Sequence, residues 1–325
     1  MCPFIFVLNM FFVAYILIRW YSMQIFNFFP NHIVNILKDF LEVSEKNLEE
    51  IRFRAGQPII LKFSNRDIVL EYKITANDLL EILEKVCENS IYSYQNQICN
   101  GYITVTEGHR VGLTGSVIIH DGKVVNIKNI SSLNFRIARQ VLGCSNEILK
   151  YIVDFNNNSI YNTLIASPPG AGKTTILRDA IRQISNGIGN FEGKTIGVVD
   201  ERSEISAMYK GIPQNDIGIR TDVLENISKS IGMKMLIRSM APEIICADEI
   251  GSMEDVETIK YIVCSGVKGI FTVHGNSLEE LKLNPAIREL LELCMFDRIV
   301  FLDSRKRGKM REIYELNNDE YYKKI

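Results

Sequence analysis

The apolar residues in the N-terminal half of the chain recur with two different periods. Side chains three and four positions apart predict amphipathic helices that begin near Asn31 and Thr75, both good N-cap residues. Strand-like segments follow at 51–54, 59–61, 68–70 and throughout 101–139. Glu107-Gly108 and Asp121-Gly122 are typical of hairpin turns between such strands. We therefore predict a small α+β domain over residues 23–145.

The C-terminal half has a different hydrophobic pattern, in which continuous apolar runs alternate with segments of helical periodicity. A helix is expected over 146–155, and the apolar runs follow at 163–166, 195–199, 244–247 and 269–273. Strands that are apolar on both sides are typical of a mainly parallel sheet with helices on both faces. Strands 299–302 and 312–316 flank the basic turn Arg305-Lys306-Arg307-Gly308-Lys309 and should close the domain as a hairpin. Residues 146–325 are thus predicted to form an α/β domain.

Composition narrows the class of protein. A chain of 325 residues, 46% hydrophobic and 23% charged, fits two globular domains. The net charge of −2 argues against a nucleic-acid-binding surface that covers the whole chain. Seven scattered cysteines without a C-x-x-C pair argue against a disulfide framework or a zinc site and favour a reducing compartment.

The first 22 residues stand apart from this picture. Residues 2–18 carry no charged side chain, and a run of that length is near the lower limit for a membrane span. We consider two interpretations of residues 1–22, a membrane anchor or a gene-model extension with translation starting at Met23, and we favour the second. If residues 1–22 are a membrane anchor, Arg19 after the apolar run favours keeping the remaining chain in the cytoplasm. With either interpretation we expect the remaining chain to face the cytoplasm.

A phosphate-binding sequence lies between strand 163–166 and the helix after it. It is Ser167-Pro168-Pro169-Gly170-Ala171-Gly172-Lys173-Thr174, followed by Thr175, and it has the form of a P-loop (Walker A) with serine in place of the first glycine. In such a loop small residues let backbone N–H groups face phosphate oxygens, the lysine reaches the β- and γ-phosphates, and the threonine hydroxyl ligates Mg²⁺. These nine residues are therefore expected to bind ATP with Mg²⁺, in a P-loop NTPase fold of the RecA/AAA-like type.

Three of the predicted strands end in side chains suited to phosphoryl transfer. The run 244–247 leads into Asp248 and Glu249 (Walker B), where Asp248 would hold Mg²⁺ and Glu249 would orient the attacking water. Glu201, after strand 195–199, is an equal candidate for the base. His274, after strand 269–273, is a candidate sensor of the γ-phosphate. Arg238 is a candidate for stabilising transferred charge, in its own chain or across a subunit boundary.

Several strings of residues together resemble one family. They are 170–175, 199–205, 237–243, 248–251 and 273–275, joined in the N-terminal half by 50–58 and 108–112. In these strings the chain resembles the stage III sporulation protein AA family, which is similar to the type II and type IV secretion ATPases. The resemblance extends from about Met23 to Leu316.

This resemblance implies an ATPase of an endospore-forming bacterium. It would work in the cytoplasm of the mother cell, peripheral to the membrane that faces the forespore, with membrane-embedded sporulation channel proteins as partners. Secretion ATPases of this kind form homo-oligomeric rings, typically hexamers, with nucleotide between the two domains and arginines contributed by neighbouring subunits. In this resemblance His274 matches their histidine box, and Asp200-Glu201 falls where their aspartate box lies.

Two other functions are compatible with a P-loop. A nucleic-acid translocase would use the basic turn at 305–309, although the net charge of −2 and the absence of an interleaved basic and aromatic run argue against nucleic acid as a partner. A non-hydrolysing, nucleotide-gated scaffold for membrane partners would not need the paired carboxylates. We expect a motor that hydrolyses Mg-ATP.

Overall fold

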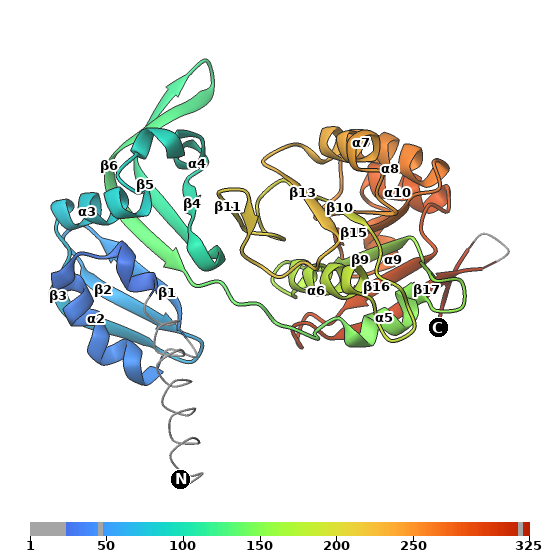
Figure 1. Cartoon of the computed structure of the whole chain (residues 1–325), viewed down its shortest axis with the longest axis horizontal. Coiled ribbons are helices and arrows are strands. Elements are labelled where there is room, and N and C mark those ends of the chain that lie inside the picture. The colour runs from blue at the N-terminus through green and yellow to red at the C-terminus, as the bar shows by residue number, and fades with distance from the viewer. Residues whose placement is uncertain (1–23, 45–47, 318–320) are drawn as a thin grey trace, which may run out of the picture. The chain divides into compact units, whose positions relative to one another are not determined.

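A computed structural model of the chain describes residues 24–44, 48–317 and 321–325. The predictions for residues 1–22 lie outside the described part. The structure divides into two compact units between Ala138 and Arg139, each with its own core (Figure 1). Among the described residues, no helix combines the length and the apolar character needed to cross a membrane.

The first unit is an antiparallel sheet with short helices. Its sheet has the strand order β3-β2-β1-β6-β5-β4. The strands are β1 (Leu48–Arg54), β2 (Pro58–Phe63), β3 (Asp67–Lys73), β4 (Tyr102–Thr104), β5 (Arg110–His120) and β6 (Lys123–Arg136). The helices are α2 (Asn31–Ser44), α3 (Ala76–Val86) and α4 (Gln95–Cys99), with 3₁₀ turns η1 (Gln24–Phe28), η3 (Ile91–Tyr94) and η4 (Thr106–Gly108).

Local sequence explains where α3 begins and which face it buries. The Thr75 hydroxyl accepts a hydrogen bond from the Asp78 N–H, and the Asp78 carboxylate accepts one from the Thr75 N–H, which makes a capping box. Leu79, Ile82 and other apolar residues at helical spacing are buried against the sheet. The predicted helix and the predicted α+β class of this unit are confirmed.

The second unit is built on an eight-stranded sheet of order β13-β10-β14-β15-β9-β16-β17-β18. The six strands from β13 to β16 are parallel, and β17 and β18 continue antiparallel. They are β9 (Thr163–Ser167), β10 (Ile196–Asp200), β13 (Thr221–Glu225), β14 (Ile244–Ala247), β15 (Lys268–His274), β16 (Arg298–Leu302), β17 (Met310–Leu316) and β18 (Tyr322–Lys324). Two small hairpins lie outside this sheet, β7 (Val153–Asp154) with β8 (Ser159–Ile160) and β11 (Met208–Tyr209) with β12 (Ile212–Pro213).

Helices cover both faces of this sheet. They are α5 (Asn146–Ile152), α6 (Lys173–Asn186), α7 (Lys229–Met240), α8 (Met253–Cys264), α9 (Leu278–Leu281) and α10 (Pro285–Glu292). Alternate residues of β9 belong to different cores, since Ile165 packs with residues of α6 while Leu164 packs with residues of α7 and α8. The predicted mainly parallel sheet with helices on both faces is therefore confirmed.

Three details differ from the pattern in the sequence. The helix expected over 146–155 ends at Ile152, because Val153 pairs with Ile160 around a turn in which the Asp154 carboxylate accepts the N–H groups of Asn156 and Asn157. Strand β13 was not predicted, since its residues are only half-buried at the sheet edge. Residues 139–145 belong to the second unit, because Asp179 of α6 accepts hydrogen bonds from Gly143 and Ser145.

Candidate nucleotide site

The loop at 167–174 joins the buried strand β9 to the start of α6. Gly172 is the N-cap of α6 with φ 101° and ψ 20°, and Gly170 has φ 78°, a region that residues with a Cβ rarely adopt. The loop therefore turns sharply enough for the N-terminus of α6 to stand at the carboxyl edge of the sheet. Backbone N–H groups at such a helix start form a ready site for an anion.

Lys173 opens α6 and is almost fully buried. Its ammonium group donates to the carbonyl oxygens of Ser167 (3.0 Å) and Pro168 (3.4 Å) and lies 3.0 Å from Nδ1 of His274. Burial lowers the pKa of Lys173, while the nearby carboxylates of Asp248 and Glu249 act in the opposite direction. The ammonium is thus held at the mouth of the loop between β9 and β15.

Thr174 and Asp248 meet at the end of β14. The Thr174 hydroxyl donates to Oδ2 of Asp248 at 2.5 Å, and the Thr272 hydroxyl donates to Oδ1 of the same carboxylate. Burial raises the pKa of Asp248 above its ordinary value, and the two hydroxyl donors lower it only in part. A hydroxyl and a carboxylate side by side match what a protein contributes to Mg²⁺ when substrate phosphates and water complete the coordination shell.

Glu249 is held in an unusual conformation by three contacts. Its backbone is left-handed, with φ 53°, and its N–H donates to the Thr272 hydroxyl at 2.8 Å. Its carboxylate lies 2.9 Å from Nε2 of His274 and accepts a hydrogen bond from Arg202 at 2.6 Å. An ammonium can only donate, so His274 accepts from Lys173 at Nδ1, and its Nε2–H is left to donate to Glu249. The side chains of Lys173, His274 and Glu249 are therefore linked in series by hydrogen bonds.

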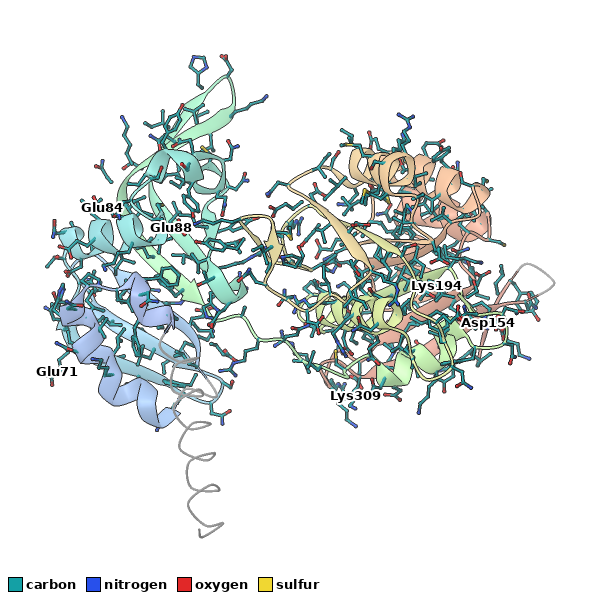
Figure 2. All side chains as sticks on the ribbon, in the orientation of Figure 1. Glu71, Glu84, Glu88, Asp154, Lys194 and Lys309 are labelled. Carbon is teal, nitrogen blue, oxygen red and sulfur yellow. The ribbon has the colours of Figure 1, made fainter. Side chains whose placement is uncertain are left out.

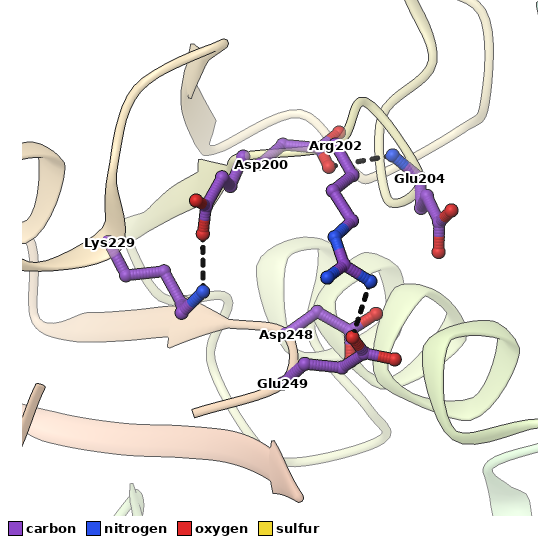
Figure 3. Close-up of a pocket in the computed structure, with 7 residues that line it drawn as sticks. Asp200, Arg202, Glu204, Lys229, Asp248 and Glu249 are labelled. Atoms are coloured by element: carbon purple, nitrogen blue, oxygen red, sulfur yellow. Dashed lines mark hydrogen bonds and ion pairs between the residues drawn. The ribbon is translucent and has the colours of Figure 1, made fainter. Parts of the chain in front are cut away.

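A pocket lies beside these three side chains, at the ends of β10 and β14 (Figure 3). Its lining consists of Asp200, Glu201, Arg202, Glu204, Lys229, Asp248 and Glu249. Figure 3 shows Arg202 reaching Glu249 from the loop after β10. Glu201 accepts a hydrogen bond from Lys229, the first residue of α7. Both candidate bases thus lie in one pocket, and each is paired with a cation.

Asp200 has a different environment from the other carboxylates. It is only 2% exposed, and its oxygens accept the N–H groups of Glu204, Ile205 and Ser206 and the Ser206 hydroxyl. Arg178 of α6 donates to the carbonyls of Glu204 and Ile205 from the other side. Asp200 therefore shapes the loop that carries Glu201 and Arg202, and its lone pairs are used in doing so.

The family model for sporulation stage III, protein AA matches residues 21–320. The chain belongs to this family. It is 40% identical over 287 residues to the stage III sporulation protein AA of Bacillus subtilis (strain 168), which spans 88% of this chain and 92% of that protein.

Solved structures confirm the fold class of this stage III sporulation protein AA family member. The ATPase DotB of Legionella pneumophila superposes with a TM-score of 0.56 at 14% identity, over 87% of this chain and 81% of that one. The pilus retraction motor PilT, crystallised with bound ADP, gives 0.54 at 16% identity, over 83% and 77%. At these identities the likeness concerns the fold, which is that of the secretion-type P-loop ATPases.

The structure brings most of the predicted site residues of this family member together. Ser167, Pro168, Pro169, Gly170, Ala171, Gly172, Lys173, Thr174 and Thr175 form the loop and the first turn of α6, and Asp248, Glu249, Glu201 and His274 surround it. Arg238 is not part of this cluster. It is exposed in the last turn of α7, about 13 Å along the helix from Lys229 at 1.5 Å per residue.

Two elements of the site escaped the sequence prediction. Thr272 contacts both Asp248 and Glu249, and its only signal in the sequence is its position two residues before His274, on the same side of β15. The basic turn at 305–309 lies against the loop, because the Gly308 N–H donates to the carbonyl of Ala171 at 2.9 Å. Among the described residues, no three His, Cys, Asp or Glu side chains converge as metal ligands.

Proposed function

We propose that this chain binds Mg-ATP at the 167–174 loop and hydrolyses it to drive a secretion-like apparatus during endospore formation. The observation that carries the proposal is that two sets of hydrogen-bonded side chains meet at the same edge of the sheet. Thr174 contacts Asp248, and Lys173 connects through His274 to Glu249. The family membership and the secretion-ATPase fold support the same function.

In this proposal the loop and Lys173 bind the phosphate chain. The backbone N–H groups of the loop and the N-terminus of α6 face the phosphates, and Lys173 reaches the β- and γ-phosphates. Thr174 and Asp248 would hold Mg²⁺, which when bound neutralises charge on the β- and γ-phosphate oxygens. Asp248 must be ionised for this, so the two hydroxyls that donate to it favour the required state.

Glu249 is the better candidate for the group that orients the attacking water. It is connected to Lys173 through His274, whereas the contact of Glu201 leads away to Lys229 on α7. His274 would report the state of the γ-phosphate, because it contacts both Lys173 and Glu249. Arg202, which occupies one oxygen of Glu249, would have to turn aside before that oxygen could accept a proton from water.

We further propose that the working form is a homo-oligomeric ring, with a hexamer as the expected size. Arg238 is exposed and lies outside the pocket of its own chain, which suits an arginine that acts at a neighbour's nucleotide. The ring would be cytoplasmic and peripheral to the mother-cell membrane that faces the forespore. Its partners there would be membrane-embedded sporulation channel proteins.

The test compares Lys173→Ala with Lys150→Ala, a matched loss of one lysine from the exposed face of α5. Phosphate release from Mg-ATP and binding of a fluorescent ATP analogue are measured in parallel. We expect Lys173→Ala to lower turnover by about 100-fold or more and Lys150→Ala to leave it unchanged. Thermal unfolding of both variants shows that they are folded.

The outcomes separate the candidate functions. Equal turnover in wild type and Lys173→Ala contradicts the assignment of the site. A wild-type chain that binds ATP without releasing phosphate, also after addition of membranes, points to the nucleotide-gated scaffold. Stimulation of phosphate release by DNA, with a steep loss as salt is raised, points to the translocase.

A further inference from the structure

The turn between β16 and β17 carries four cations on an ordered backbone. Arg305, Lys306, Arg307 and Lys309 are all exposed, and Lys309 is labelled at the surface of the second unit in Figure 2. The Asp303 carboxylate accepts the N–H groups of Arg305 (2.7 Å) and Lys306 (3.2 Å), and the Asp303 N–H donates to the carbonyl of Lys309 (2.8 Å). The backbone that presents the cations is therefore fixed.

This turn is joined directly to the 167–174 loop. The Gly308 N–H donates to the Ala171 carbonyl at 2.9 Å. A Cβ placed on Gly172 would lie 3.4 Å from the Gly308 nitrogen and 3.6 Å from Cγ of Arg307. The side chain of Arg307 therefore begins beside the last loop residue before Lys173.

The sheet order decides which side of the loop the turn occupies. Strand β9 lies between β15 and β16, and all three are parallel, so their carboxyl ends share the edge at which ligands bind. His274 and the acidic groups stand on the β15 side. The basic turn stands on the β16 side, away from Glu249.

The charges that line the pocket indicate that a bound nucleotide needs additional positive charge from elsewhere. Five carboxylates and two cationic side chains line the pocket at the ends of β10 and β14, a formal excess of three negative charges. A nucleoside triphosphate is itself strongly negative, so its phosphate chain needs positive charge beyond that pocket. Lys173 supplies one such charge. The basic turn offers others from the β16 side of the loop, opposite the β15 side on which His274 and the acidic groups lie.

We propose that Arg307 is a nucleotide-binding residue that contacts the α-phosphate of ATP from its own chain. This inference rests on the proposed function. The transferred phosphate belongs next to Glu249 and His274, so the part of the phosphate chain nearest the nucleoside extends toward the β16 side. A guanidinium has a planar pair of donors that matches phosphate oxygens. Among the four cations, Arg307 is the one whose stem lies beside Gly172.

The experiment measures the dissociation constants of ATP, ADP and tripolyphosphate for the full chain and for Arg307→Gln, together with kcat and KM for ATP. Arg288→Gln is the control, since it removes one exposed arginine from α10 of the same unit. We expect Arg307→Gln to weaken ATP and ADP by the same factor, about tenfold, and tripolyphosphate by a similar factor. The KM for ATP should rise and kcat should stay constant, because the contact is the same before and during phosphoryl transfer.

Each other outcome contradicts the inference in a recognisable way. Unchanged dissociation constants would show that Arg307 does not touch the nucleotide. A loss of affinity for ATP but not for ADP would place the contact at the γ-phosphate. A loss for both nucleotides without a loss for tripolyphosphate would place it at the nucleoside. A wild-type chain that does not bind ATP at all would overturn the proposed function as well.

Discussion

Thr272 offers the sharpest test of how the site is held together. Its side chain is fully buried, and its hydroxyl donates to the Asp248 carboxylate while accepting the Glu249 N–H at 2.8 Å. The substitution Thr272→Val keeps the shape of the side chain and removes only these two hydrogen bonds. It therefore separates the role of the hydroxyl from the packing of β15.

The structure sets the size of the expected effect. A buried N–H left without its acceptor costs about 1–3 kcal/mol, so we expect the free energy of unfolding to fall by about 2 kcal/mol. The left-handed backbone of Glu249 costs about 1–2 kcal/mol, and without this hydrogen bond it is free to relax. A carboxylate displaced by about 1 Å should lower kcat about 100-fold, while KM for ATP changes much less because Lys173 and the loop are intact.

The assay combines urea unfolding with steady-state phosphate release. Thr163→Val is the matched control, because its hydroxyl is equally buried and donates to the Tyr161 carbonyl at 2.7 Å at the far end of the neighbouring strand β9. It should lose about 1 kcal/mol of stability and no turnover. Thr272→Ser restores the hydroxyl and should recover most of kcat.

Two results would refute this reasoning. If Thr272→Val turned over at the wild-type rate, the hydroxyl would not be what positions Glu249. If Thr163→Val lost kcat to the same degree, the effect would belong to the sheet as a whole and not to the contact with Asp248 and Glu249.

Two further predictions concern other carboxylates of the second unit. Glu249→Gln should abolish turnover while ATP still binds, and Glu201→Gln should lose less than about tenfold; equal losses in phosphate release would contradict the assignment of Glu249. Although burial raises the pKa of Asp179, hydrogen bonds from Ser145 and Arg182 bring it down to about 2, so Asp179→Asn should lose about 2 kcal/mol of stability at pH 7. The lowered pKa of Asp179 stabilises the fold fully at pH values above the unfolded pKa, which is near 4. Urea unfolding should therefore give the same difference in stability between wild type and Asp179→Asn at pH 5 and pH 7, and this difference should shrink only as pH falls from about 4 toward 2. A difference that changes between pH 5 and pH 7 would count against this account.

Local pattern was enough to identify the class of the second unit and the phosphate loop. Fully apolar runs identify strands of a parallel sheet because such strands are buried on both faces. The loop is a contiguous string whose glycines, lysine and threonine act through neighbouring backbone atoms, so it can be recognised without knowing what lies next to it. The ends of the parallel strands could also be assigned to one edge, which is why Asp248 and His274 were expected near Lys173.

The local sequence pattern does not predict which side chains contact one another across that edge. Glu201 and Glu249 follow similar apolar strands and were equal candidates, and only the contacts of His274 and Lys229 distinguish them. Asp200 follows an apolar strand as Asp248 does, yet its oxygens accept hydrogen bonds from backbone N–H groups of the loop after β10. Such partners depend on loop conformations that carry no periodic signal.

The sequence by itself determined the two-unit organisation in outline, the parallel sheet and the residues of the phosphate loop, because each of these follows from the order of apolar and small residues along a continuous stretch. Only the tertiary structure decided which side chains complete the site. Thr272 reaches Asp248 because β14 and β15 are neighbours in the sheet, and Arg307 lies beside Gly172 because β16 pairs with β9 across more than a hundred residues of chain. The strand order that creates these contacts is set by how the whole domain packs, and no local pattern records it.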